Sequence, residues 1–279
     1  RRPRITLSLV MTANRPRFRS PKPVIAMIHV GALPGTPAHR HDLRALEAGA
    51  VREAKILRAA GVHGVMLENM HDVPYLNREV GPEITASMAI LSSQIKNEFQ
   101  VPCGIQILAG ANEAALACAF CAGLDFIRAE GFVFGHLADE GYMDSCAGNL
   151  LRYRKKLNAE NVRIFCDIKK KHSSHALTSD VSLQETAKAA EFFLSDGLIV
   201  TGKATGYMAD TTEIEQVKQA TSLPVLVGSG VDVHNVDQYL PLADALIVGS
   251  SFKRNGIWSH PIEQERVRSF MDKVREIRD

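Results

Sequence analysis

Polar and ionisable side chains follow the apolar, strand-like runs of this chain at the points where those runs end. The set combines acids, bases, amides and a hydroxyl: His29, Glu68, Asn69, Gln106, Arg128, Glu130, Asp167, Lys169 and Thr201. Burial of so many polar groups is costly unless they pair with one another or meet a ligand. The pattern therefore predicts a site for a polar small molecule, with groups suited to proton transfer.

Four of these side chains are the candidates for acid–base catalysis. Histidine is the side chain that ordinarily changes charge near neutral pH, so His29 is suited to general acid or base catalysis, unless it only bonds the next loop. Glu68 is suited to act as a base or substrate ligand, or to pair with Arg128. Asp167 and Lys169 alternate along one apolar run, so we expect both to point into the same site. A plain buried ion pair between them is the alternative.

Two turns of small residues near the C-terminal end predict a phosphate site. Gly228-Ser229-Gly230 closes one apolar run and Gly249-Ser250-Ser251 closes the next. Small residues let backbone N–H groups approach an anion closely, and a following helix turns its positive end to the same point. Ordinary turns after buried strands are the alternative. Further candidate substrate ligands at the strand ends are Asn69, Gln106, Arg128, Thr201 and Gly202.

A basic run, Lys169–Lys171 with His172 and His175, follows the fifth apolar run. It is suited to an anionic substrate, although charge runs are usually solvated. Lys203 is a conceivable Schiff-base lysine, but Gly202 before it implies a turn rather than a rigid mount. No ligand spacing in the sequence predicts a metal site, and none identifies a cofactor.

The elements that must position these residues follow a repeating β/α pattern. Eight continuous apolar runs alternate with amphipathic segments; the runs begin near Val24, His63, Cys103, Asp125, Arg163, Gly197, Pro224 and Ala243. Continuous apolar strands are typical of a parallel sheet covered by helices on its faces. We therefore predict an α/β fold, a (β/α)8 TIM barrel, with the site at the carboxyl ends of its strands. A doubly wound sheet is the alternative, but no G-x-G-x-x-G follows the first strand.

The helix starts and the bulk composition agree with this fold. Asp42, Asn112 and Ser182 are predicted N-caps of three of the helices. The 279 residues are 46% apolar and 23% charged, with a net charge of +2, which gives no reason to expect nucleic acid as a partner. No apolar run approaches the roughly 20 residues of a transmembrane helix. The sequence leaves open whether the chain forms a homo-oligomer.

The first 22 residues are basic and are predicted to lie outside the barrel, which is assigned to residues 23–279. From Arg1 to His41 the chain contains no acidic residue, and arginines are frequent before Pro23. Such an Arg-rich, acid-free segment is typical of an organellar transit peptide. We expect import into mitochondria; plastids, or a disordered basic tail on a cytoplasmic protein, are the alternatives.

Several motifs resemble the BtpA/SgcQ family from Pro23 to the C-terminus: KPVIAMIHVGALPGTP, AGVHGVMLENMHDVPY, DEGYMDSCAGNLLRYRKKL, DIKKKH, SDGLIVTGKATG and ADALIVGSSFK. The resemblance implies a barrel of the ribulose-phosphate-binding type. The founding member is described as a thylakoid-associated factor needed for photosystem I accumulation, and other members belong to bacterial sugar-utilisation clusters. A mitochondrial presequence would exclude the photosystem role here. Positions matching the motifs are site candidates by location: His29, Glu68, Asn69, Asp72, Asp167, Lys169, Thr201 and Gly202.

Three functions are compatible with these features. The first is an enzyme, an isomerase or lyase, acting on a small phosphorylated metabolite such as a sugar phosphate or nucleotide. The second is a non-catalytic assembly or stability factor for a membrane protein complex. The third is a metabolite sensor that keeps the phosphate site without turnover.

Overall fold

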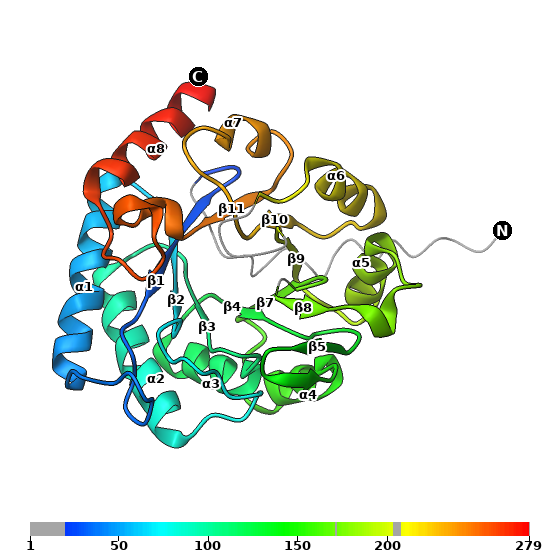
Figure 1. Ribbon diagram of the computed structural model, residues 1–279, viewed down its shortest axis with the longest axis horizontal. Coiled ribbons are helices and arrows are strands. Elements are labelled where there is room, and N and C mark those ends of the chain that lie inside the picture. The colour runs from blue at the N-terminus through cyan, green and yellow to red at the C-terminus, as the bar shows by residue number, and fades with distance from the viewer. Residues whose placement is uncertain (1–19, 171, 203–207, 279) are drawn as a thin grey trace.

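Eight parallel strands close into a barrel at the centre of the molecule (Figure 1). The computed structural model describes residues 20–170, 172–202 and 208–278. Around the barrel the strands are β1 (Val24–His29), β11 (Ala245–Val248), β10 (Val225–Val227), β9 (Gly197–Val200), β7 (Arg163–Asp167), β4 (Phe126–Ala129), β3 (Cys103–Gln106) and β2 (Gly64–Glu68). The predicted (β/α)8 TIM barrel is confirmed.

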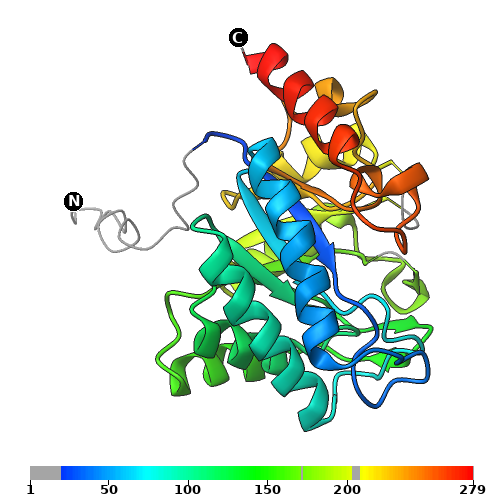
Figure 2. The ribbon, with the colours of Figure 1, turned by 90° about the vertical axis from the view of Figure 1, so that its left-hand side faces the viewer.

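Helices surround the strands on the outside (Figure 1). They are α1 (Leu43–Ala60), α2 (Pro82–Glu98), α3 (Asn112–Ala122), α4 (Ala147–Lys156), α5 (Leu183–Phe192), α6 (Thr211–Ala220), α7 (Val236–Tyr239) and α8 (Gln264–Arg278). Figure 2 shows α1 lying along the outer face of the barrel. Within the described residues, none of the helices has the length and apolar character needed to span a membrane.

The helix N-termini follow the predicted caps with one exception. The Asp42 side chain accepts a hydrogen bond from the Ala45 amide, and Ser182 forms a capping box with Glu185. Asn112 is instead the first residue of α3 and caps nothing. Its side chain binds the backbone of Glu130, accepting from the N–H at 3.2 Å and donating to the carbonyl at 2.7 Å. Asn112 therefore fixes the end of β4 rather than the start of a helix.

An apolar plug fills the barrel interior below the strand ends. It consists of Ile25, Met27, Met66, Phe126, Phe165, Ile199, Leu226, Ala245 and Ile247. The Phe126 and Phe165 rings lie 5.4 Å apart between centroids. A Cβ on Gly104 would come within 2.1 Å of the Phe126 ring, so a side chain at 104 has no room. The apolar residues therefore close the barrel interior, and the polar residues at the strand ends lie above them, at the mouth, the open end of the barrel formed by the carboxyl ends of the strands.

A small antiparallel sheet, absent from the sequence prediction, covers part of the mouth. It consists of β6 (Gly141–Met143), β5 (His136–Ala138) and β8 (Ser173–Ser174), in that order. The β5 and β6 strands lie in the long segment between β4 and α4, where the repeating β/α pattern includes no strand. The Asn77 side chain donates to the Tyr142 carbonyl at 2.8 Å and so ties the segment after β2 to this cap sheet.

Candidate functional site

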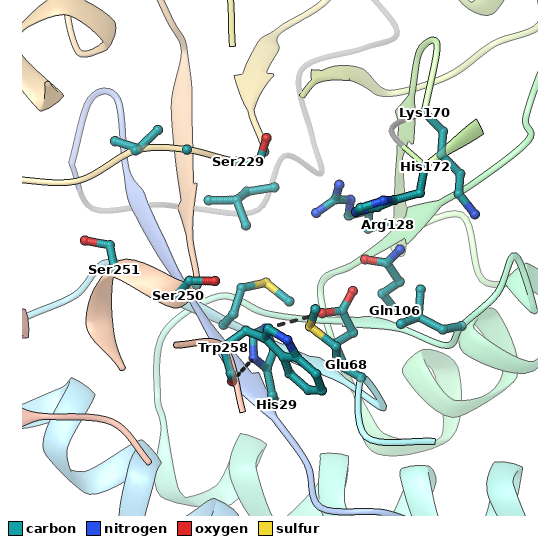
Figure 3. A pocket seen from close by; sticks show the side chains of 18 of the residues that line it. His29, Glu68, Gln106, Arg128, Lys170, His172, Ser229, Ser250, Ser251 and Trp258 are labelled. Carbon is teal, nitrogen blue, oxygen red and sulfur yellow. Dashed lines mark hydrogen bonds and ion pairs between the residues drawn. The ribbon is translucent and has the colours of Figure 1, made fainter. Parts of the chain in front are cut away.

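A cavity of about 440 Å³ opens at the mouth, at the carboxyl ends of the strands (Figure 3). This volume is in the range of small-molecule sites. The lining combines the two small-residue turns with ionisable and aromatic side chains, among them His29, Glu68, Gln106, Arg128, Glu130, Lys170, His172 and Trp258. The cavity lies where the barrel architecture places active sites.

His29 and Glu68 form a pair on neighbouring strands, where β1 and β2 place them directly opposite each other. The His29 Nε2 atom lies 3.4 Å from Glu68 Oε2, and both side chains are buried. The His29 Nδ1 atom lies 3.0 Å from the Trp258 carbonyl oxygen, which only accepts, so Nδ1 carries a proton. Nε2 is then the nitrogen that takes up or releases a proton beside the Glu68 carboxylate. The pair is suited to general acid–base chemistry.

Both small-residue turns line the same cavity: Gly228, Ser229, Gly230, Gly249, Ser250 and Ser251. A Cβ on Gly249 would lie 3.5 Å from His29 Nε2. A Cβ on Gly228 would lie 3.4 Å from Arg128 Nη2 and 2.4 Å from an Ile199 methyl group. The turns therefore lie next to His29 and Arg128. At Gly228 and Gly249 they present backbone atoms to the cavity, because glycine has no side chain.

The helices after these turns differ from the prediction. The α7 helix has four residues and begins at Val236, beyond the turn, while the second turn leads into a 3-10 helix, Ser250–Phe252. Such short helices have little dipole to offer. Any anion held here would depend on the turn amides and on Arg128 instead.

Arg128 and Asp167 form a buried bidentate pair. Arg128 Nε and Nη2 donate to Asp167 Oδ2 and Oδ1 at 2.9 and 2.8 Å. Burial acts to lower the pKa of Arg128, but the Asp167 carboxylate raises it above its ordinary value. The guanidinium lines the main cavity, whereas Asp167 lines a smaller neighbouring pocket. Asp167 thus orients Arg128 instead of facing the mouth as expected.

Lys169 also differs from its predicted position. Strand β7 ends at Asp167, and Lys169 has a φ of 48°, so the strand alternation that would pair the two side chains has stopped. The Lys169 ammonium donates to the Val181 carbonyl at 2.6 Å, away from the main cavity. Lys170 takes the place at the mouth, with Nζ 3.3 Å from Glu130 Oε2 and 3.7 Å from Glu140 Oε2.

Glu130 and Glu140 complete this side of the mouth, and sequence reasoning gave neither of them a role. Burial raises the pKa of Glu130, although Lys170 acts against the shift. Glu130 was visible in the sequence as a polar residue at a strand end. Glu140 was not, because it lies in the β5–β6 hairpin turn and meets the cavity only through the cap sheet.

Asn69 and Asp72 connect loops and do not line the cavity. Asn69 accepts from the Leu108 amide at 2.7 Å and donates to Asp72 at 2.9 Å. Asp72 in turn accepts from the Leu33 amide at 2.8 Å. These bonds join the segments after β1, β2 and β3. The position of Asn69 is explained by this network without a ligand.

Gln106, Thr201 and Gly202 have different surroundings. Gln106 is buried and lines the cavity, and its Oε1 has no hydrogen-bond partner. Thr201 is buried outside the cavity lining. The Gly202 amide donates to Ser229 Oγ at 2.8 Å, which links the loop after β9 to the first small-residue turn. Lys203 lies outside the described residues. Among the residues that are described, no three His, Cys, Asp or Glu side chains form a group able to hold a metal ion.

Comparisons with known proteins agree on a family and a fold. The BtpA family model matches residues 20–276. A Caenorhabditis elegans protein whose name includes "mitochondrial" is 47% identical, with 99% of each chain covered. The photosystem I biogenesis protein BtpA of Synechocystis is 33% identical over 93% of this chain and 90% of its own. Orotidine 5'-monophosphate decarboxylase of Methanocaldococcus jannaschii superposes with a TM-score of 0.60 at 12% identity, covering 91% of this chain and 99% of that one, which is similarity of fold alone.

Proposed function

This chain belongs to the BtpA family, and from that premise we propose that it is an enzyme acting on a small phosphorylated metabolite by acid–base chemistry. One observation supports the proposal above all others. The two small-residue turns and the His29–Glu68 pair line one cavity, with His29 Nε2 next to Gly249. A phosphate on the turns would therefore bring the attached carbon skeleton to the proton-transferring pair.

The phosphate is assigned to the amides of Gly228–Gly230 and Gly249–Ser251. Arg128 supports this assignment because its Nη2 lies beside Gly228, and arginine suits phosphate oxygens. The M. jannaschii enzyme of the same fold is named for a 5'-monophosphate, and a phosphorylated ligand in this chain is compatible with that name. The orientation of Arg128 is fixed by Asp167, so the guanidinium is preorganised for an anion.

The His29–Glu68 pair is assigned the proton transfer. In an isomerase or lyase reaction it would remove a proton from a carbon near the phosphate and return it to a neighbouring atom or to a leaving group. Lys170 is assigned a hydrogen bond to an oxygen of the carbon skeleton at the opposite side of the cavity, because an ammonium has three N–H donors and only two of them are directed at Glu130 and Glu140. In this assignment Lys170 replaces Lys169, whose ammonium is bonded elsewhere.

Thermal unfolding with a panel of phosphorylated metabolites tests the proposal. A ligand at a hundred times its dissociation constant should add about 2.7 kcal/mol of stability, a rise of a few degrees. We expect a selective metabolite to exceed inorganic phosphate, and the rise to disappear in Ser229→Asp and Ser250→Asp. Ser93→Asp, which adds the same charge on the exposed face of α2, should keep it. Stabilisation that survives both cavity substitutions would contradict the phosphate assignment.

An assembly factor is the second candidate. The Synechocystis relative is named for photosystem I biogenesis. Three apolar side chains at the end of α5 are exposed, Phe192 at 82%, Phe193 at 46% and Leu194 at 67%, which suits contact with another protein. This function predicts that deletion lowers the abundance of a complex and that His29→Gln still restores it. Restoration lost only with cavity variants would favour the enzyme.

Mitochondrial import is assigned to residues 1–22. Their Arg-rich, acid-free composition and the mitochondrial name of the C. elegans relative both support it over a plastid. The test is a fluorescent protein fused behind residues 1–22, with an initiator methionine. We expect mitochondrial fluorescence that becomes diffuse when Arg15, Arg17 and Arg19 are replaced by Glu. Diffuse fluorescence of the parent fusion would contradict the assignment.

A further inference from the structure

Two buried acceptor atoms on one side of the cavity have no hydrogen-bond partner. They are Gln106 Oε1 and Glu140 Oε2; the second atom has only an ion pair with the Lys170 ammonium, at 3.7 Å, which is too long for a hydrogen bond. Gln106 is 2% exposed and the Glu140 side chain 8%. A buried acceptor that receives no hydrogen bond is costly, and native structures contain few of them. Both residues line the main cavity, so a ligand is the natural source of the missing donors.

The protein itself offers few donors on this side. Lys170 and Arg128 both lie on this side of the cavity (Figure 3). The Lys170 ammonium is shared between Glu130 and Glu140, and Arg128 Nε and Nη2 donate to Asp167. The Tyr75 hydroxyl donates to the Met70 carbonyl at 2.8 Å and is therefore occupied. Asp139 adds another carboxylate to the lining. None of these groups donates a hydrogen bond to Gln106 Oε1, and the carboxylates of Glu130, Asp139 and Glu140 line the same cavity.

This acceptor-rich side is opposite the small-residue turns. Figure 3 shows Gln106 and Lys170 on one side of the pocket and Ser250 and Ser251 on the other, with His29 and Glu68 between. A ligand that places its phosphate on the turns would extend past His29 toward Gln106. The two acceptors that receive no hydrogen bond then select the chemistry of its far end.

We propose that Gln106 and Glu140 select a phosphorylated metabolite whose far end presents hydrogen-bond donors, as the hydroxyl groups of a polyol or sugar chain do, and that they disfavour a carboxylate there. The proposal rests on the phosphate assignment made above and adds its specificity. A donor group satisfies both acceptors, whereas a second anion would face Glu130, Asp139 and Glu140.

Binding to the purified 279-residue chain by calorimetry tests the proposal with matched compounds. The probes are n-propyl phosphate, glycerol 3-phosphate, 3-phosphoglycerate, ribitol 5-phosphate and free ribitol. We expect glycerol 3-phosphate to bind about tenfold more tightly than n-propyl phosphate, the effect of one buried hydrogen bond. Ribitol 5-phosphate should bind more tightly still, and 3-phosphoglycerate more weakly than glycerol 3-phosphate.

Variants assign the preference to the two residues. Gln106→Met should remove the preference, so that glycerol 3-phosphate and n-propyl phosphate bind about equally. Gln106→Glu, which keeps an acceptor, should restore part of the preference. Glu140→Met, on the cap hairpin, tests the same point if Gln106→Met does not fold. Ser92→Ala is the matched control, because Ser92 Oγ is also buried without a partner but lies on α2, away from the cavity.

The outcomes separate this proposal from the phosphate assignment. Equal binding of propyl and polyol phosphates, or tighter binding of 3-phosphoglycerate, overturns the selectivity and leaves the phosphate site standing. Binding of free ribitol without any gain from phosphate overturns the phosphate assignment and supports the donor preference. No binding of any probe overturns both.

Discussion

At the level of single residues, one position along the chain decides which lysine meets the cavity. The apolar run Arg163–Lys169 predicted a strand up to Lys169, because Ile168 continues the pattern. The strand ends two residues earlier, and the Ile168 amide bonds the Ile199 carbonyl at 3.1 Å. Lys169 then turns outward and Lys170 inward. The periodicity of the sequence does not predict this turn, because the turn depends on the hydrogen bond from Ile168 to β9.

The two lysines give a matched prediction. Lys169→Met removes a charged donor from the Thr178 and Val181 carbonyls and should cost about 1–3 kcal/mol of unfolding free energy, with ligand affinity unchanged. Lys170→Met should instead weaken the binding of the metabolite identified by thermal unfolding at least tenfold. Chemical denaturation and calorimetry measure the two effects. If Lys169→Met abolished binding, the assignment of Lys170 would fail.

Gly228 gives a second prediction at this level. An alanine Cβ there would come within 2.4 Å of Ile199, inside the packed barrel, so Gly228→Ala should cost about 1–3 kcal/mol. Gly49→Ala is the control: it lies within α1 with nothing nearer than 3.7 Å, and should stabilise by about 0.5–1 kcal/mol. Urea unfolding of both variants measures the contrast. Equal effects would contradict the close packing at Gly228.

At the level of elements, a buried ion pair anchors the segment after β11. Lys253 Nζ lies 2.8 Å from Glu53 Oε2 on α1, and Glu53 Oε1 also accepts from the Ile262 amide at 3.0 Å. The segment between Lys253 and Ile262 includes Trp258, whose carbonyl binds His29. One carboxylate therefore holds both ends of a loop that begins directly after the second small-residue turn, where Lys253 follows Ser250–Phe252, and that orients the proposed base.

Glu53→Gln should weaken this anchor. The amide still bonds Lys253 but carries no charge, so we expect a loss of about 1–3 kcal/mol in stability and roughly tenfold in phosphate affinity. Glu265→Gln is the control, because its pair with Arg268 is exposed and worth less than about 1 kcal/mol. Unchanged phosphate affinity in Glu53→Gln would show that the anchor does not act on the turn.

The cap sheet predicts a pH dependence of stability. Burial, with help from Lys170 and His175, lowers the pKa of His136 to about 4. The unfolded chain takes up this proton below about pH 6.5, and the folded chain only near pH 4. Stability should therefore fall as the pH is lowered from 6.5 to 4. The full shift corresponds to about 3 kcal/mol, and screening by solvent reduces this to on the order of 1–2 kcal/mol for this group.

Replacement of single histidines tests whether His136 causes the loss of stability at low pH. His136→Asn should flatten the loss between pH 6.5 and 4 in part, because burial also lowers the pKa of His63 to about 4. His234→Asn, at an exposed position, should leave the profile unchanged. A profile that His136→Asn does not alter would assign the acid sensitivity to other groups.

For the whole molecule, the barrel could be predicted from the sequence because its signal is local and repeated. Each strand is a continuous apolar run, and each small-residue turn lies at the end of one. The distinction between Gln106 and Asn69 could not be predicted, since both are amides at strand ends and differ only in which loops approach them. The cap sheet was missed because its strands have two or three residues and pair across the chain.

Closure of the barrel also joins the first strand to the last. Val24 on β1 lies beside Leu246 on β11, and the Lys22 ammonium donates to the Leu240 carbonyl at 2.8 Å. A chain that emerges from a ribosome or a translocase cannot pair β1 with β11 until Val248 has left the exit of that channel. Until then β1 keeps an open edge, which can pair with other chains. The barrel of this protein therefore closes only once its last strand is available, and chaperones that hold the open barrel would act in that interval.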